Sequence, residues 1–108
     1  MTTFKYALSI CGMSQQQAAD FLGVSLPSIK HWSSGRSAPP EGVWVMLADL
    51  FERVQDAADS AADVLALEGI DPRAWANVEA DKGDDPLPDG ADGAAGAMAL
   101  LMAVSDRQ

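Results

Sequence analysis

The amino-acid sequence predicts an all-α protein, and its composition and glycine pattern carry that prediction. The 108 residues include 19 alanines but only 12 valines, isoleucines and threonines together. Alanine has the highest helix propensity, whereas β-branched residues favour strands. Glycines divide the chain into segments in which apolar residues recur with the helical period. We therefore expect five or six helices and no sheet.

The first two expected helices are short. Residues 3–11 carry apolar side chains at the spacing of one helical face, and Gly12 ends this helix. Ser14 then occupies an N-cap position, and Gln17, three residues later, completes a capping-box pattern. The second helix is therefore expected at Gln15–Leu22, before the next glycine.

The third expected helix is short and the fourth is long. Ser25 is the N-cap candidate of the third helix, and Pro27 is tolerated because amides of the first turn need no intrahelical partner. This helix should run to about Ser34, with Gly35 as its C-terminal stop. After a loop with two prolines, a long helix is expected from residue 40 to about residue 68.

The signals beyond the long helix are weaker. We expect a short helix at residues 71–80 and a linker at residues 81–93, which hold five aspartates, three glycines and two prolines. Residues 94–104 are apolar on nearly every side, so a helix there must dock onto this chain or another one. The expected division is a first domain of residues 1–69 and a helical extension of residues 70–108 that contributes to dimerisation.

The charge is unevenly distributed along the chain. The net charge is −9, with +2 in residues 1–40 and −11 in residues 41–108. Nucleic acid attracts cationic surfaces, so only the first segment suits it. Acidic residues recur at spacings of three and four along the long helix, which indicates a solvated face, a repulsive face that orients DNA, or a dock for a basic partner. They are Asp49, Glu52, Asp56, Asp59 and Asp63.

The sequence also argues against several classes of function. The single cysteine, Cys11, excludes an internal disulfide and is expected to be a small buried side chain. No further ligands cluster with the single histidine, His31, so no metal site is expected. We also expect no cofactor and no enzyme activity, because no nucleophile–base set or phosphate loop is visible. Without a membrane-length apolar run or a signal peptide, the expected location is the cytoplasm, away from membranes.

Residues 15–36 carry the functional prediction, because two short helices meet there at a glycine. Gly23 can adopt a positive φ at little steric cost, and the small Ala19 lets the two helices approach closely. Apolar residues fill the angle between the helices; they are Val24, Ile29 and Trp32, together with Ala18 and Leu22. This spacing resembles that of the phage-repressor and Cro-like, XRE-type helix-turn-helix family. The following Trp-x-x-Gly-Arg-x-x-x-Pro segment is similar as well, and the resemblance covers about residues 3–55.

The resemblance implies a repressor-like helical bundle whose second motif helix, residues 26–34, enters the major groove of double-stranded DNA. Positions implied for base contacts are Ser25, Leu26, Pro27, Lys30, His31 and Ser34. Positions implied for phosphate contacts are Gln15, Gln16, Arg36 and Ser37. Many relatives have polar readers where this chain has Leu26 and Pro27, so direct readout is expected to depend on Lys30, His31 and Gln16, with a larger contribution from DNA shape.

The long helix is expected to extend beyond the bundle. About 28 residues span roughly 40 Å, which a motif bundle of this size does not cover. We expect a homodimer at the alanine-rich end, through Ala57, Ala61, Leu65, Met98 and Leu101. The alternative is packing of the C-terminal helices against the long helix of the same chain. A twofold dimer would place two reading helices about 34 Å apart, one turn of DNA.

These observations together predict a sequence-specific transcription regulator that acts as a dimeric repressor of an inverted repeat. By analogy with other small regulators, the repeat could lie in its own operon. Two alternatives stay open. The chain could be an antitoxin or phage-type inhibitor that binds a protein partner through its acidic C-terminal region. A helix-turn-helix fold could also serve protein contacts alone, because fold does not fix function.

Overall fold

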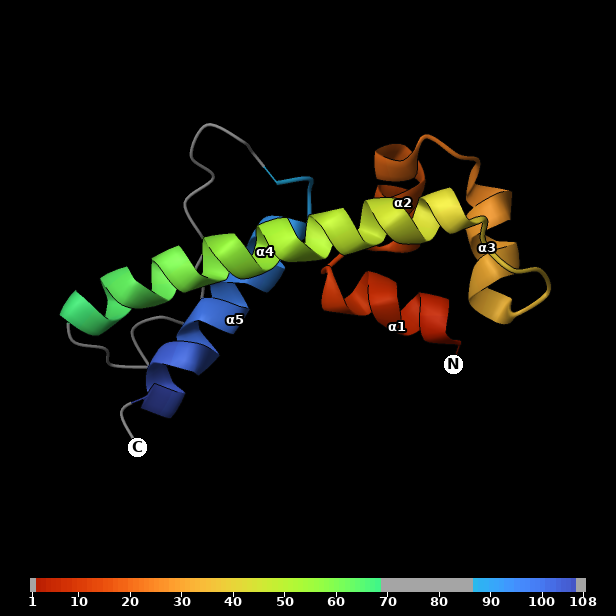
Figure 1. Ribbon diagram of the computed structural model, residues 1–108. Coiled ribbons are helices and arrows are strands. Elements are labelled where there is room, and N and C mark those ends of the chain that lie inside the picture. Colours follow the sequence, from red (N-terminus) through yellow and green to blue (C-terminus); the bar gives the residue numbers. More distant parts are fainter. Residues whose placement is uncertain (1, 69–86, 107–108) are drawn as a thin grey trace.

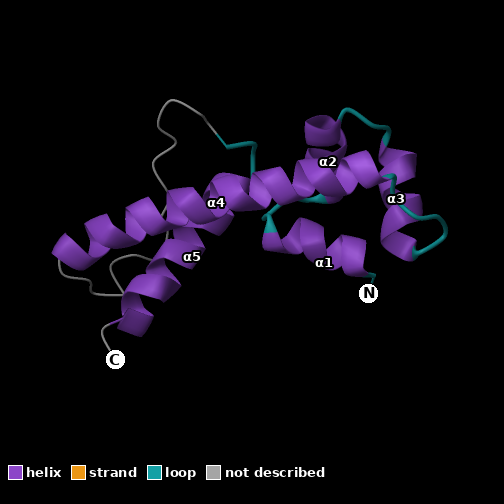
Figure 2. Cartoon of the chain, viewed as in Figure 1, coloured by secondary structure: helices purple, strands orange, loops and turns teal. Residues whose placement is uncertain are grey.

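A computed structural model describes residues 2–68 and 87–106 of the chain. These residues form five helices and no strand, in agreement with the all-α prediction (Figures 1 and 2). The helices are α1 (Thr3–Ile10), α2 (Gln15–Leu22), α3 (Leu26–Ser34), α4 (Glu41–Glu68) and α5 (Ala91–Asp106). The bounds of the first four lie within one residue of those predicted.

The three short helices begin at hydrogen-bonded caps. The hydroxyl groups of Thr2, Ser14 and Ser25 each accept a hydrogen bond from the backbone N–H three residues further on, at 3.2, 3.1 and 3.3 Å. Each cap satisfies an N–H that the first helical turn leaves without an intrahelical partner. Gly23, with φ of 69°, ends α2 in the left-handed conformation. The predicted turn between the two motif helices is therefore confirmed.

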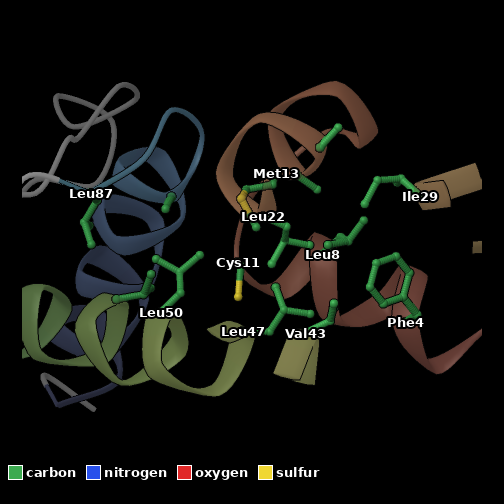
Figure 3. Packing of buried hydrophobic residues seen from close by; sticks show 14 of the residues in the cluster. Phe4, Leu8, Cys11, Met13, Leu22, Ile29, Val43, Leu47, Leu50 and Leu87 are labelled. Carbon is green, nitrogen blue, oxygen red and sulfur yellow. The ribbon is translucent and has the colours of Figure 1, made fainter. Parts of the chain in front are cut away.

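Large side chains fill a main core between α1, α2, α3 and the first half of α4 (Figure 3). Phe4 lies at its α3 end, where its ring meets Trp32 and Trp44 edge to face at centroid distances of 5.7 and 5.9 Å. Cys11 is buried here as predicted. The buried members of the main core are Phe4, Leu8, Cys11, Met13, Ala18, Ala19, Leu22, Ile29, Val43, Leu47, Leu50, Val54, Leu87, Ala91 and Ala95.

Helix α5 packs alongside the second half of α4 and runs in the same direction (Figure 1). Every fourth residue of α5 is a buried alanine, at positions 91, 95, 99 and 103. Alanine side chains allow close approach of the two helix backbones. A second, smaller cluster, here called the distal core, consists of Ala58, Ala62, Leu65, Ala99 and Ala103. The same chain therefore covers the alanine-rich end of α4, which is the alternative to dimerisation named above.

The predicted start of the last helix is wrong by three residues. A turn formed by residues 88–90 starts α5 at Ala91, since the N–H of Ala91 donates to the Pro88 carbonyl at 3.0 Å and that of Ala94 to the Gly90 carbonyl at 3.1 Å. Gly93 thus lies inside the helix rather than in a linker. Residues 81–86 of the expected linker and the short helix expected at residues 71–80 lie outside the described residues. The division into domains of residues 1–69 and 70–108 stays a prediction.

A contact between two turns joins α5 to the motif. Gly12, between α1 and α2, has φ of 77°, and Gly90, before α5, has φ of 91°. A methyl group on Gly12 would meet the Gly90 carbonyl oxygen and the Ala94 side chain, and one on Gly90 would meet the Gly12 carbonyl oxygen and the Gln17 side chain. The two backbones therefore approach at a distance that only glycine permits. We call this contact the glycine junction.

Candidate nucleic-acid interface

Helix α3, the predicted reading helix, is held by its inner side. Ile29 is fully buried, and the half-buried Trp32 ring rests against Phe4 of α1. Thr2 Oγ1 also donates a hydrogen bond of 2.7 Å to the carbonyl oxygen of Ser33. Side-chain packing and a hydrogen bond from the residue that caps α1 therefore fix the position of α3.

Hydrogen bonds order both ends of α3. At the start, Ser25 Oγ lies 2.9 Å from Ser28 Oγ in addition to its cap bond. At the end, the Ser34 hydroxyl donates to the His31 carbonyl at 3.2 Å, and the N–H of Arg36 donates to the same carbonyl at 2.9 Å. Ser25 and Ser34, two of the predicted base contacts, thus already make hydrogen bonds within the helix, which reduces what they offer to a base.

The outer side of α3 presents most of the other predicted base contacts. Lys30, His31 and Pro27 are exposed, and Leu26 is half-buried. Ile29 and Ser33, one helical turn apart, are buried, whereas Lys30 and His31 are exposed, so the donors of Lys30 and His31 lie on the solvent side of the helix. This is the geometry that direct readout in a major groove requires. The individual base contacts stay predictions.

The predicted phosphate contacts lie at the two ends of the motif. Arg36 and Ser37 are exposed just after α3, Gln16 is exposed in the first turn of α2, and Gln15 is half-buried. Gln16 Nε2 donates a hydrogen bond of 3.2 Å to Asp20 Oδ1 one helical turn later. Sequence reasoning missed this pair, although the separation of four residues on a helix is a signal for it. The pair occupies one of the two amide donors of Gln16.

The charges of the chain are also separated in space. The stripe residues Asp49, Glu52, Asp56, Asp59 and Asp63 are all exposed. The stripe begins at the ninth residue of α4 and continues away from the α4 end that adjoins α3 (Figure 1). Lys30 and Arg36 therefore lie at one end of the molecule, and most of the α4 carboxylates lie toward the other. The electrostatic field favours contact with a polyanion at the α3 end.

An apolar groove of about 230 Å³ lies between α1 and α4, and its lining includes Ile10, Cys11, Trp44 and Phe51. Burial raises the pKa of the Cys11 thiol, so the thiol stays protonated at neutral pH. Within the described ranges 2–68 and 87–106, no cluster of three or more potential metal ligands occurs and no helix is long and apolar enough to span a membrane.

The predicted dimerisation residues fall in different environments. Leu65 is buried, and Ala57, Ala61 and Met98 are half-buried by packing within the chain. Leu101 is the exception, with 71 % of its surface exposed. Four of the five predicted dimerisation residues therefore pack within the chain, and Leu101 is exposed to solvent. The dimer contact stays a prediction.

A comparison with protein families decides what the motif is. The model of a helix-turn-helix family of the XRE type matches residues 10–55. This stretch is a helix-turn-helix domain. The match includes α2, α3 and the first half of α4, and it confirms the resemblance stated above. No curated protein and no solved structure matches the chain significantly.

The match suggests a coarse function for residues 10–55. The matched family is one of DNA-binding regulatory domains and is not an enzyme family. The match ends at residue 55, before the distal core begins. The second half of α4 and all of α5 therefore lie outside the matched helix-turn-helix stretch.

Proposed function

We propose that the chain is a dimeric repressor that binds an inverted repeat in double-stranded DNA through the outer side of α3. One observation carries the proposal. The inner side of α3 is fixed by Ile29, Trp32 and the hydrogen bond from Thr2, while Lys30 and His31 are exposed on the outer side. Such a helix meets a groove without reorganisation, and its donors suit the acceptor atoms of guanine.

Two features of the chain support binding to DNA as a dimer. One copy offers few free donors to bases, because Ser25 and Ser34 are engaged within α3 and Leu26 and Pro27 are apolar. The first 40 residues carry a net charge of only +2, which predicts modest affinity for phosphate. A twofold dimer doubles both contributions and requires an inverted repeat with half-sites about 34 Å apart.

The test begins with selection of bound sequences from random duplex DNA, followed by titration of the selected duplex. Lys30→Ala and His31→Ala should each weaken binding by about 5- to 150-fold, corresponding to about 1–3 kcal/mol for a base contact. Lys5→Ala, at an exposed position of α1, is the matched control for loss of one charge and should change affinity much less. Fluorescence anisotropy at fixed salt measures binding, and circular dichroism verifies the fold. Wild-type affinity in both α3 variants would refute the docking face.

The acidic stripe favours a second candidate function, an inhibitor or antitoxin that binds a basic protein. Its carboxylates are exposed along α4 and take no part in either core. A double variant, Asp56→Asn with Asp59→Asn, should weaken capture of such a partner and leave DNA affinity unchanged or slightly higher. A partner retained equally by the double variant would exclude the stripe as its binding surface.

A further inference from the structure

The turn of residues 88–90, which starts α5, also adjoins the start of α2. A methyl group on Gly90 would lie 2.8 Å from Gln17 Oε1, in addition to meeting the Gly12 carbonyl oxygen. Gln17 Oε1 is the atom of the capping box that accepts the hydrogen bond from the N–H of Ser14, at 2.9 Å. The glycine junction therefore packs directly against the cap of α2.

The same turn follows the side of α2 beyond the cap. A hollow of about 290 Å³ is bordered by both, and its lining consists of Gln17, Asp20, Phe21, Pro88 and Asp89. The carboxylate of Asp20 accepts the hydrogen bond from Gln16 Nε2 at 3.2 Å. The surface of α2 that adjoins the turn thus continues, through this pair, to a predicted phosphate contact.

Both flanks of the turn are buried in the main core. Leu87 precedes the turn (Figure 3), and the fully buried Ala91 and Ala95 follow it. Hydrogen bonds from the N–H groups of Ala91 and Ala94 to carbonyl groups of the turn hold its shape. Because protein interiors are closely packed, the turn cannot move without displacing these buried groups. It therefore gives the start of α2 a fixed support.

The two motif helices are supported by different parts of the chain. Helix α3 is held by residues near the N-terminus, through the hydrogen bond from Thr2 and the contact of the Phe4 ring with Trp32. The start of α2 is held by the turn before α5, about 75 residues further along the sequence. A change at this turn should therefore displace the start of α2 and leave α3 in place.

We propose that the turn of residues 88–90 positions the start of α2 for contact with DNA phosphate, with Gly90 and Gln17 as positioning residues. The inference rests on the proposed function, in which Gln15 and Gln16 at this start contact phosphate. A hydrogen bond weakens steeply when its donor is displaced or tilted, so the position of the first turn of α2 sets the strength of these contacts. The DNA-binding unit then extends beyond the family match, which ends at residue 55, to the beginning of α5.

A double-mutant cycle on the full chain tests the coupling between the turn and α2. Gln16→Ala should weaken binding to the selected duplex about tenfold, the loss expected for a hydrogen bond to a charged group. In the Gly90→Ala background the same substitution should weaken binding by less than about twofold, because the start of α2 is already displaced. Lys30→Ala should cost the same factor in both backgrounds, and Gly93→Ala is the control background that should behave like the wild type. Equal factors for Gln16→Ala with and without Gly90→Ala would overturn the proposal, because a general loss of stability lowers all affinities together.

A second variant decides the case if circular dichroism shows that Gly90→Ala does not fold. Ala94→Val opens the junction without placing a side chain at a positive φ, because the Ala94 side chain already lies against Gly12. Ala97→Val, at an exposed position of the same helix, is the matched control. Gln16→Ala should lose its effect in the Ala94→Val background and keep it in the Ala97→Val background. An effect of about tenfold in both backgrounds would overturn the proposal.

Nuclear magnetic resonance of the chain without DNA separates the junction from the proposed function. In Gly90→Ala the amide resonances of Ser14 and Gln17, which form the capping box, should shift, whereas that of Ile29 in α3 should keep its wild-type position. This result for a chain that binds no duplex would support the attachment of α2 to the turn and refute the repressor function. Unshifted α2 resonances in a chain that binds the inverted repeat would refute the positioning role and leave the function standing.

Discussion

The main core and the distal core stabilise the molecule in different ways. The main core joins aromatic and branched side chains from four helices, and Phe4 contacts both Trp32 and Trp44 there. The distal core consists of four alanines and Leu65 between two helices. Interlocking large side chains fix a single arrangement, whereas alanine surfaces allow close approach with little shape to specify it. The first arrangement therefore holds α3 in one orientation, and the second aligns α5 with α4 without fixing the pair as firmly.

The largest expected effect compares one residue from each core. Phe4→Ala should lower the free energy of unfolding by about 3–5 kcal/mol, because it removes a buried ring and two aromatic contacts. Ala58→Gly, at a fully buried position in the distal core, should lower it by about 1–2 kcal/mol through helix propensity and one lost methyl group. Urea unfolding measures both values. Equal decreases in the free energy of unfolding for the two variants would contradict the stronger packing expected of the main core.

The glycine junction provides the next comparison. Gly23→Ala should cost about 1–2 kcal/mol, because the residue has a positive φ but open space around it. Gly90→Ala adds a collision with the Gly12 carbonyl oxygen and should cost about 1–3 kcal/mol more. Gly93→Ala, inside α5 with open space, is the control and should stabilise by about 0.5–1 kcal/mol. Thermal unfolding of the three variants ranks their stabilities. A smaller loss of stability for Gly90→Ala than for Gly23→Ala would contradict the close approach of the Gly12 and Gly90 backbones.

The smallest expected effect concerns the attachment of α3 within the helix-turn-helix half. Thr2→Val keeps the shape of the side chain but removes the hydrogen bond to the Ser33 carbonyl and the cap bond to Lys5, which should cost about 1–2 kcal/mol. Thr2→Ser retains the hydroxyl group and should lose much less. Urea midpoints distinguish the two variants. Identical midpoints would show that packing alone holds the end of α3.

Local signals account for the part of the fold that the sequence predicted well. Serine caps and the following glycines set the bounds of α2 and α3, and the capping box of Ser14 and Gln17 has both of its hydrogen bonds. These features act within a few residues, so the sequence displays them directly.

Contacts between distant residues account for the rest. The hydrogen bond from Thr2 joins residues 31 positions apart, and the glycine junction joins turns that are further apart still. Nothing local indicates that these groups meet. The start of α5 was placed too late because Gly93 was taken as part of a linker, whereas packing of Ala91 and Ala95 into the main core stabilises helix there. Tertiary burial outweighed the low helix propensity of glycine.

Helix α4 is one uninterrupted element that contributes to both cores, so its length sets the distance between the two cores. Each residue inserted into its middle would lengthen it by about 1.5 Å and rotate everything beyond by about 100°. An insertion of seven residues would restore the direction to within about 20° while moving the far end by about 10 Å. Helix α5 would oppose such an insertion, because Ala91 and Ala95 pack in the main core while Ala99 and Ala103 pack in the distal core, so the two helices keep their matched lengths only together.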